Sequence, residues 1–432
     1  MRLVRIFSLG VVLGSANCGG RTSLEIDTLN NGGMPSTGGT AAAGGAPANG
    51  GVRSVAGGSS SAGRVSTAGQ PSFGGSGGNA GACAWSFAPR GGYVVGSIPG
   101  DVVTGDFDGD GFLDLAVSAG NDIRISFNRK DGTFSPPLAV PGGEVPVSLT
   151  PGDFNGDGSL DLATVTNVDG TSAVSLLFNR GDGSFRAPIT FPAGRTPNLV
   201  SVGDLDRDGS LDLAVTNYGS ISIFLNRGDG TFLPQTIYEA AGCLNFALGD
   251  FDGNGSLDIA ATNLFDGTVA ILFNQGTGTF NPSAIAFAAG NAAFGIAPAD
   301  FNGDGALDLA ISHDDTSIAN AEGQTVAVLL NRGDGTFAAR ASYGVGAFAG
   351  ELRAADLDAD GRPDLVVPNE HDNTLSVLLN RGDGSFLPQA VYATGRLPER
   401  TAIGDFDHDG QLDLAVNNWA DLSIGLFFGS CH

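Results

Sequence analysis

Hydrophobic residues after position 85 occur in short runs of Val, Ile, Leu and Phe, separated by segments rich in Gly, Asn and Asp. This alternation is typical of strands joined by tight turns, because β-branched and aromatic residues favour strands. In one stretch it predicts four strands, at Val147–Phe154, Leu160–Asn167, Ala173–Phe178 and Ser184–Phe191. This part of the chain is therefore expected to be all-β.

The pattern recurs along the chain at intervals of 47, 51, 46, 50, 56 and 49 residues. Each copy reads Asp, Phe or Leu, Asp or Asn, any residue, Asp or Asn, Gly, two residues, and Asp. The seven copies begin at Asp106, Asp153, Asp204, Asp250, Asp300, Asp356 and Asp405. Four short antiparallel strands in about 50 residues form one propeller blade, and a blade must stack on its neighbours to bury both faces. We therefore expect a seven-bladed β-propeller of four-stranded antiparallel blades.

The two ends of the repeat region complement each other. The last copy has its third strand at residues 422–428 and then ends, whereas Ser86–Pro89 with Tyr93 matches the fourth-strand pattern Ser385–Pro388 with Tyr392. An N-terminal strand that completes the last blade would close the ring and remove an exposed edge.

The cysteines near these ends predict a disulfide. Cys83 precedes the closing strand and Cys431 follows its partner, so we expect them to bond, with two unpaired thiols as the alternative. Cys243 stands near the start of an innermost strand and is expected to be a buried free cysteine.

Residues 1–18 predict an export signal, with basic Arg2 and Arg5 before the apolar run Ile6–Leu13. Cys18 resembles the lipidated cysteine of bacterial lipoproteins, although Asn17 departs from the usual small residue before it. Residues 19–82 contain 19 glycines among 64 positions and no apolar period, which predicts a disordered linker. The sequence thus predicts a signal at 1–18, a linker at 19–82 and a propeller at 83–432. The mature protein is expected outside the cytoplasm, as a cell-surface or outer-membrane lipoprotein or as a secreted protein.

The formal net charge of −25 belongs to the propeller, because no acidic residue lies between Asp27 and Asp101. So acidic a domain repels nucleic acid and anionic membranes, which leaves a lipid anchor as the expected contact with a membrane. Divalent cations are the natural partners of these acids. We expect a monomer.

The acidic segment of each copy falls between the first and second strands, where its side chains can converge while Gly at the sixth position permits a sharp turn. A hard cation that takes six to eight oxygens suits this set, and no sulfur or imidazole recurs in it. We predict up to seven Ca²⁺, held by the first, third, fifth and ninth side chains and the seventh carbonyl; metal-free Asp-Gly turns are the alternative. The predicted ligands are Asp106, Asp108, Asp110, Phe112 and Asp114; Asp153, Asn155, Asp157, Ser159 and Asp161; Asp204, Asp206, Asp208, Ser210 and Asp212; Asp250, Asp252, Asn254, Ser256 and Asp258; Asp300, Asn302, Asp304, Ala306 and Asp308; Asp356, Asp358, Asp360, Arg362 and Asp364; Asp405, Asp407, Asp409, Gln411 and Asp413.

These residues carry a resemblance to a known family. Gly-Asp-Phe-Asn-Gly-Asp-Gly-Ser-Leu-Asp-Leu-Ala at 152–163, with Asn-Arg-Gly-Asp-Gly-Ser-Phe at 179–185, resembles the FG-GAP or VCBS repeats and is similar to the propeller of integrin α subunits. The resemblance implies calcium in hairpin loops on one face and ligand contacts on the other. It names no ligand, because the family serves adhesion, sugar binding and accessory roles in enzymes.

On the face opposite the metal loops, the turns vary between copies. They bring aromatic, histidine and acidic side chains that would suit a glycan or a protein ligand, although ordinary solvated loops would look the same. The candidate ligand-binding residues are Tyr218, Phe265, His313, Asp315, His371 and Trp419. The longest turn, His313–Thr325, is the first choice for a functional insertion.

Four Arg-Gly-Asp triplets, at Arg180, Arg227, Arg332 and Arg381, recur at one hairpin. They favour a tight turn whose Arg reaches neighbouring loop acids over an adhesion motif. No strong nucleophile or zinc motif occurs, so the sequence favours a binding or scaffold module over an enzyme. A calcium-dependent, lyase-like carbohydrate-active enzyme and a purely structural surface protein remain the alternatives.

Overall fold

The computed structural model describes residues 85–143, 145–168, 171–240, 242–281, 284–313 and 324–431, all within one compact unit. The predicted signal and linker, together with Cys18, Cys83 and Asp315, lie outside these residues. In the described ranges no helix is long and apolar enough to cross a membrane.

The strands form seven four-stranded antiparallel sheets, which confirms the predicted architecture. Blades 1 to 3 comprise β2 (Pro99–Gly105), β3 (Asp114–Ala119), β4 (Asp122–Ser126) and β5 (Leu138–Pro141); β6 (Pro146–Gly152), β7 (Asp161–Val168), β8 (Thr171–Leu177) and β9 (Ile189–Pro192); β10 (Leu199–Gly203), β11 (Asp212–Asn217), β12 (Ser220–Phe224) and β13 (Thr236–Glu239). Blades 4 to 6 comprise β14 (Cys243–Gly249), β15 (Asp258–Asn263), β16 (Thr268–Leu272) and β17 (Ile285–Ala288); β18 (Ala293–Ala299), β19 (Asp308–His313), β20 (Thr325–Leu329) and β21 (Ala341–Gly344); β22 (Arg353–Ala355), β23 (Asp364–Asn369), β24 (Thr374–Leu378) and β25 (Ala390–Ala393). Blade 7 comprises β26 (Pro398–Gly404), β27 (Asp413–Asn418), β28 (Ser423–Cys431) and β1 (Trp85–Val94), with the short 3₁₀ helix η2 (Trp419–Asp421) between β27 and β28.

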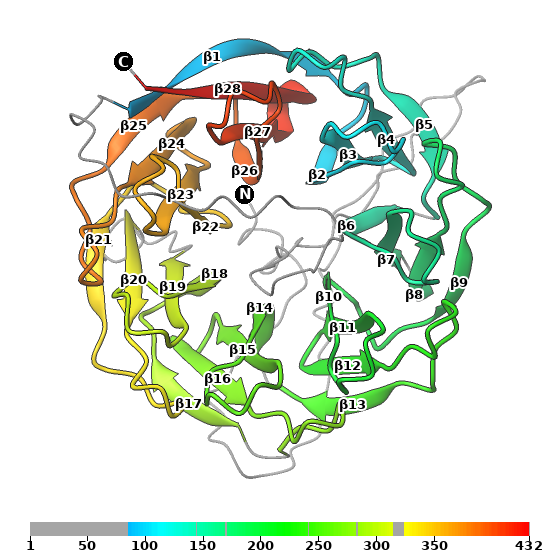
Figure 1. Ribbon diagram of the computed structural model, residues 1–432. Helices are drawn as coiled ribbons and strands as arrows, with labels where there is room; N and C mark the ends of the chain where they lie inside the picture. Colours follow the sequence, from blue (N-terminus) through cyan, green and yellow to red (C-terminus); the bar gives the residue numbers. More distant parts are fainter. Residues whose placement is uncertain are drawn as a thin grey trace, which may run out of the picture. The chain divides into compact units, whose positions relative to one another are not determined.

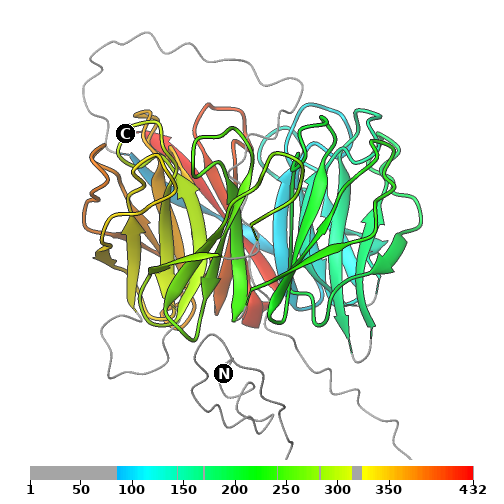
Figure 2. The ribbon, with the colours of Figure 1, turned by 90° about the horizontal axis from the view of Figure 1, so that it is seen from below.

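The blades surround a centre, and the first strand of each blade lies nearest to it (Figure 1). Seen from the side, the strands run between two faces (Figure 2). Because strands alternate in direction, the loops between first and second strands share one face with the hairpins between third and fourth strands. The turns between second and third strands share the opposite face with the connections between blades.

The N-terminal strand closes the ring as predicted. β1 pairs antiparallel with β28, from Trp85 opposite Cys431 to Val94 opposite Ser423. Cys431 is disulfide-bonded, but its predicted partner is outside the described residues, so the pairing with Cys83 stays a prediction. Cys243 is free and buried, as expected.

The fourth strand of blade 2 is shorter than the predicted Ser184–Phe191. In blade 2 it begins at Ile189, whereas Phe185 makes only an isolated bridge to Asn179. Pro188 precedes the strand and has no N–H to donate to a ladder, which delays regular pairing.

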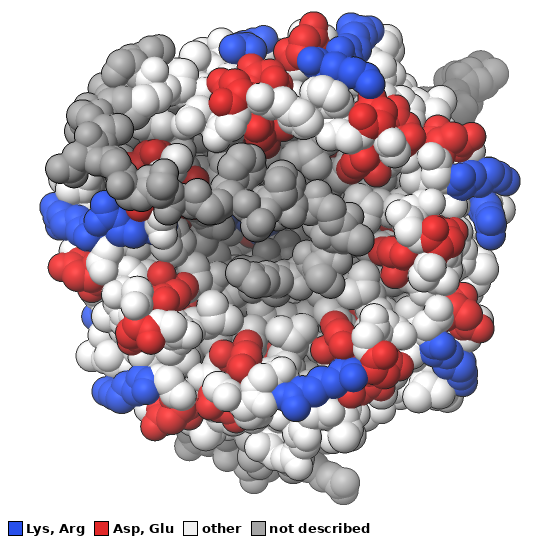
Figure 3. All heavy atoms as spheres, in the orientation of Figure 1, with Lys and Arg blue, Asp and Glu red and all other residues white. Residues whose placement is uncertain are grey.

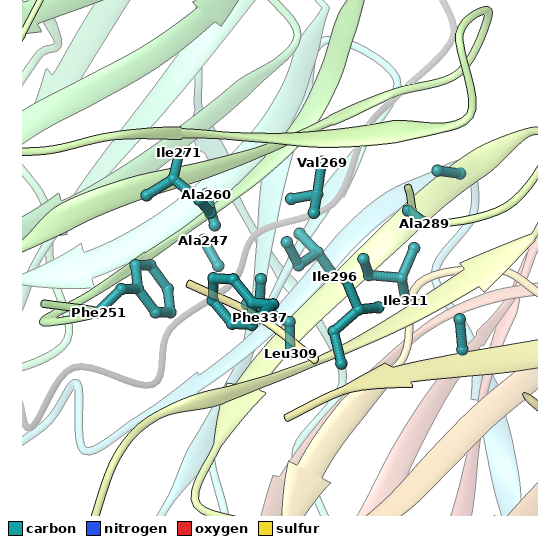
Figure 4. Close-up of a cluster of buried hydrophobic side chains, with 13 residues drawn as sticks. Ala247, Phe251, Ala260, Val269, Ile271, Ala289, Ile296, Leu309, Ile311 and Phe337 are labelled. Carbon is teal, nitrogen blue, oxygen red and sulfur yellow. The ribbon is translucent and has the colours of Figure 1, made fainter. Parts of the chain in front are cut away.

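Neighbouring blades bury their apolar faces against each other. In the cluster of Figure 4, Phe251 and Ile271 of blade 4 pack with Ile296, Ile311 and Phe337 of blade 5. The rings of Phe251 and Phe337 lie 6.2 Å apart at 60°. Burying a side chain of this size stabilises the fold by roughly 1.5–3 kcal/mol relative to exposure, so the contact between blades is a major source of stability.

An asparagine that starts each third-to-fourth-strand hairpin also joins adjacent blades. Asn331 of blade 5 donates from Nδ2 to the carbonyl of Leu307 in its own blade at 3.0 Å and to that of Phe251 in blade 4 at 2.8 Å. The same paired contacts are made by Asn128, Asn179, Asn226, Asn274 and Asn380. In blade 7, Gly429 takes this place, because a Cβ there would lie 2.5 Å from the carbonyl oxygen of Leu412.

A buried ion network lies where blades 6, 7 and 1 meet. The Arg400 guanidinium of β26 is 2.7 Å from Asp101 of β2 and 3.2 Å from Glu351, which precedes β22. Arg353 also pairs with Glu351. The network spans the contact between blades 6 and 7, which has Gly429 in place of the bridging asparagine.

Candidate metal loops and ligand face

The first Asp of each acidic loop organises the loop backbone. Asp106 accepts hydrogen bonds from the N–H groups of Asp110 and Gly111, each at 3.0 Å. A corresponding bond to the sixth-position N–H is made by Asp153, Asp204, Asp250, Asp300, Asp356 and Asp405. The loop is therefore wrapped around this carboxylate.

Two loop positions adopt left-handed backbone. The sixth is Gly in all seven blades, as the sequence indicated, with φ of 92° at Gly111. The fourth also has positive φ throughout, yet three blades place another residue there, namely Arg207 at 64°, Ala359 at 61° and His408 at 56°. The sequence interpretation treated the fourth position as free; the glycine in the other four copies was the signal it missed.

The fifth position closes a local turn. Asp110 accepts from the N–H of Phe112 at 2.9 Å, and the same bond recurs at Asp157, Asp208, Asn254, Asp304, Asp360 and Asp409. The six Asp side chains have a second oxygen outside this turn, whereas Asn254 has only the amide oxygen that accepts the bond from Ser256.

The ninth Asp is fully buried and joins three parts of its blade. Asp114 begins β3, and its two oxygens accept from the N–H groups of Phe107 at 2.9 Å and Asn128 at 2.8 Å. The other six blades repeat this arrangement, although in blade 7 the donor in the third strand is Gly429. The carboxylate thus ties the loop to the second and third strands.

Carboxylates converge in the loops. In four blades one oxygen from each of the first, third and ninth residues lies within 4.8 Å of the others, in Asp106–Asp108–Asp114, Asp204–Asp206–Asp212, Asp250–Asp252–Asp258 and Asp405–Asp407–Asp413. In blade 6 the group is Asp356, Asp358 and Asp360. Blades 2 and 5 have Asn155 and Asn302 at the third position, so an amide oxygen replaces one acid.

Burial and crowding raise the pKa of the ninth Asp. Desolvation is the main cause, backbone hydrogen bonds oppose it, and neighbouring loop acids add to it. The pKa is raised from 3.8 to about 7 for Asp114, Asp161, Asp212, Asp258, Asp364 and Asp413, and to about 6 for Asp308. The loops therefore hold several carboxylates close together, and a bound cation would reduce the repulsion between them.

These residues fit a hard divalent cation. The Oδ1 atoms of Asp356 and Asp407 are buried and have no hydrogen-bond partner, which is the state expected of oxygens that serve a metal. The side-chain oxygens match the preference of Ca²⁺. The imidazole ring of His408 stacks on the ring of Phe112, with centroids 4.0 Å apart, and therefore has a packing role. Acidic side chains are distributed around the face seen in Figure 3.

The Arg-Gly-Asp hairpins are structural turns. Asp182 accepts from the N–H of Ser184 at 3.0 Å and from its hydroxyl at 2.6 Å, and these bonds lower the pKa of the carboxyl group. The expectation that the arginines reach neighbouring loop acids is wrong for Arg180, Arg227 and Arg332. Their guanidinium groups donate instead to a Phe carbonyl of the same hairpin, at 2.8–3.0 Å.

The candidate ligand-binding residues are spread over the opposite face. Tyr218 and Phe265 lie in turns of blades 3 and 4 and are 65% and 51% exposed. His371 stacks on Phe348 in blade 6, with centroids 3.6 Å apart, and burial lowers its pKa. Trp419 begins η2 in blade 7. These four residues come from four different blades.

His313 is not a surface residue, and this prediction is corrected. Its side chain is buried at the end of β19, where Nδ1 lies 3.0 Å from the Thr325 carbonyl and Nε2 3.0 Å from that of Ala289. Residues 314–323, most of the turn singled out as an insertion, lie outside the described residues.

A profile of the FG-GAP-like repeat family matches residues 106–164, 164–215, 204–261, 250–311, 313–367 and 356–416. The matches cover more than half of the chain, so the protein belongs to the FG-GAP-like repeat family. No curated protein sequence matches it significantly.

Solved structures share the fold at low sequence identity. An Agrocybe aegerita lectin that recognises non-reducing terminal N-acetylglucosamine is 22% identical, with a TM-score of 0.51 over 69% of this chain and 81% of the lectin. BBS1N in complex with ARL6DN is 13% identical, with a TM-score of 0.55 over 80% and 97%. A putative 6-phosphogluconolactonase from Bacteroides uniformis is 17% identical, with a TM-score of 0.54 over 75% and 90%.

Proposed function

We propose that the protein is an exported, calcium-binding β-propeller that acts as a binding or scaffold module for a glycan or protein ligand. The observation that carries the proposal is the repeated acidic loop, in which carboxylates meet within 4.8 Å and buried oxygens of Asp356 and Asp407 lack partners. Ca²⁺ would be held by the first, third, fifth and ninth side chains and by a backbone carbonyl. It would supply charge neutralisation and bind the loop to the strands that carry the ninth Asp.

The opposite face is proposed to bind the ligand. Exposed aromatic rings such as Tyr218 and Phe265 suit stacking on a sugar or anchoring in a protein interface. Related folds serve both purposes, since the Agrocybe aegerita protein is a lectin and BBS1N binds ARL6DN. An integrin α-like adhesive role outside the cytoplasm belongs to the same proposal, with secretion or acylation of Cys18 as the route to the surface.

A glycan array probed with the full chain, in calcium and then in chelator, tests this function. We expect calcium-dependent binding that falls at least tenfold when Tyr218 and Phe265 are both changed to Ala. Ile189→Ala with Ile237→Ala is the matched control, because these side chains are similarly exposed but lie on outer strands.

Other outcomes would favour the competing functions. Calcium binding without capture of any glycan or protein would indicate a structural surface protein. Calcium-dependent cleavage of an acidic polysaccharide to unsaturated products would indicate the lyase-like enzyme.

A further inference from the structure

Four of the seven acidic loops contain four acids, and the other three replace one acid by Asn155, Asn254 or Asn302. The four-acid loops belong to blades 1, 3, 6 and 7. In blades 1, 6 and 7 a basic side chain forms an ion pair with one of the predicted ligands. These are Lys130 with Asp110 at 3.3 Å, Arg362 with Asp360 at 2.5 Å and Arg90 with Asp407 at 2.9 Å.

Lys130 and Arg362 depart from the repeat at their positions. Lys130 replaces the hairpin glycine of other blades and adopts a φ of 68°, a conformation that costs about 1 kcal/mol for a residue with a side chain. Arg362 occupies the seventh loop position, which carries Phe, Ser, Ala or Gln elsewhere. Lys130 therefore adopts a strained backbone at a position where its Nζ lies 3.3 Å from Asp110.

Arg90 links the closing strand to the loop of blade 7. It comes from β1, and besides Asp407 it covers the Phe428 ring at 4.1 Å from the centroid. Gly91 and Gly92 follow it, and a Cβ at Gly92 would lie 2.3 Å from the carbonyl oxygen of Ile424. The close approach of β1 to β28 therefore brings the guanidinium to the loop.

We propose that Arg90, Lys130 and Arg362 are built-in counter-ions that lower the calcium affinity of the loops in blades 7, 1 and 6. This inference rests on the proposed calcium binding. A cation on a ligand carboxylate occupies one of its oxygens and repels a divalent ion, which at a few ångströms in a partly exposed site amounts to about tenfold in affinity. The three loops therefore bind Ca²⁺ at higher calcium concentrations than they would without these side chains. In the metal-free protein, the same side chains reduce the repulsion among the four acids of each loop.

The test compares two triple variants of the full chain by calorimetric calcium titration, with bound ions counted by native mass spectrometry. Arg90→Gln/Lys130→Gln/Arg362→Gln should tighten three sites about tenfold each and should lower the melting temperature in chelator but not in calcium. Arg180→Gln/Arg227→Gln/Arg332→Gln is the control, because these guanidinium groups bond to hairpin carbonyls, and it should titrate like the unaltered protein.

The outcomes separate the inference from the proposed function. Seven bound ions with unchanged or weaker affinity in the first variant would overturn the counter-ion role and leave calcium binding intact. No bound calcium in any of the three proteins would overturn both.

Discussion

A single backbone conformation at the fourth loop position shows how the repeat is constrained residue by residue. Position four is left-handed in every blade, yet Ala359 adopts it at a φ of 61°. For a residue with a Cβ this costs about 1–2 kcal/mol, which exceeds the entropy that Gly would lose on folding.

Ala359→Gly should therefore raise the free energy of unfolding by about 0.5–1 kcal/mol. Gly303→Ala, at the same position of blade 5 with a φ of 74°, should lower it by a similar amount. Urea denaturation of both variants measures the effect. A loss of stability in Ala359→Gly would show that the side chain has a role beyond the turn.

The asparagine that starts the hairpin between the third and fourth strands stabilises the contact between neighbouring blades. Asn331→Ala removes two hydrogen bonds to buried carbonyls and should cost about 2–4 kcal/mol. Asn121→Ala, in an exposed turn, is the control and should change stability by less than about 0.5 kcal/mol. Equal values for the two variants in thermal denaturation would refute the bridging role.

At the scale of elements, each metal loop couples protonation to stability. At the ninth position, burial raises the pKa of the carboxyl group, from 3.8 to about 7 for Asp114. The folded chain therefore binds the carboxyl proton more tightly than the unfolded chain does. The stabilisation from this group is complete below pH 3.8 and is lost as the pH rises through about 7.

In chelator, therefore, the seven groups together should make the protein less stable at pH 8 than at pH 5.5. With calcium the trend should vanish, because the bound ion replaces the proton and its binding near pH 7 releases protons. Melting temperatures across this range, with and without chelator, check the result. A chelated protein whose stability increases from pH 5.5 to pH 8 would contradict the raised pKa.

The sequence predicted the elements of the fold well, because the period of the repeat identifies strand order and count. It placed the closing strand, since Ser86–Pro89 repeats the pattern of Ser385–Pro388. It placed the acids of the loops as well, but not that the fifth side chain closes a turn while the ninth is buried between strands.

The contacts between blades could not be predicted from the sequence. From the sequence, His313 was assigned to an exposed turn. In the folded chain its ring is buried, and Nε2 lies close to the carbonyl of Ala289 in the neighbouring blade. The side-chain bridge from Asn331 to Phe251 crosses 80 residues, which no local pattern reveals.

At the scale of the whole molecule, closure depends on the meeting of blades 6, 7 and 1. The bridging asparagine is absent from blade 7, where the structure has β1, Gly429 and the buried pairs of Arg400. Arg400→Ala would leave Asp101 without this buried counter-ion and Glu351 with only Arg353.

Arg400→Ala should therefore cost about 3–5 kcal/mol in urea unfolding, the usual loss when one partner of a buried pair is removed. Arg396→Ala provides the control. Arg396 pairs with Asp421 at 2.6 Å but is 69% exposed, so its loss should cost less than about 1 kcal/mol. A small effect of Arg400→Ala would show that the inner strands hold the closure without the ions.

The most direct test of calcium binding is thermal unfolding of the full chain in saturating calcium and in excess chelator, with bound metal counted by mass spectrometry. We predict seven Ca²⁺ per chain and a large fall in melting temperature on chelation, since each site filled at 100 times its dissociation constant adds about 2.7 kcal/mol. A chain that binds no calcium and melts identically in both solutions would contradict the metal loops and the function built on them.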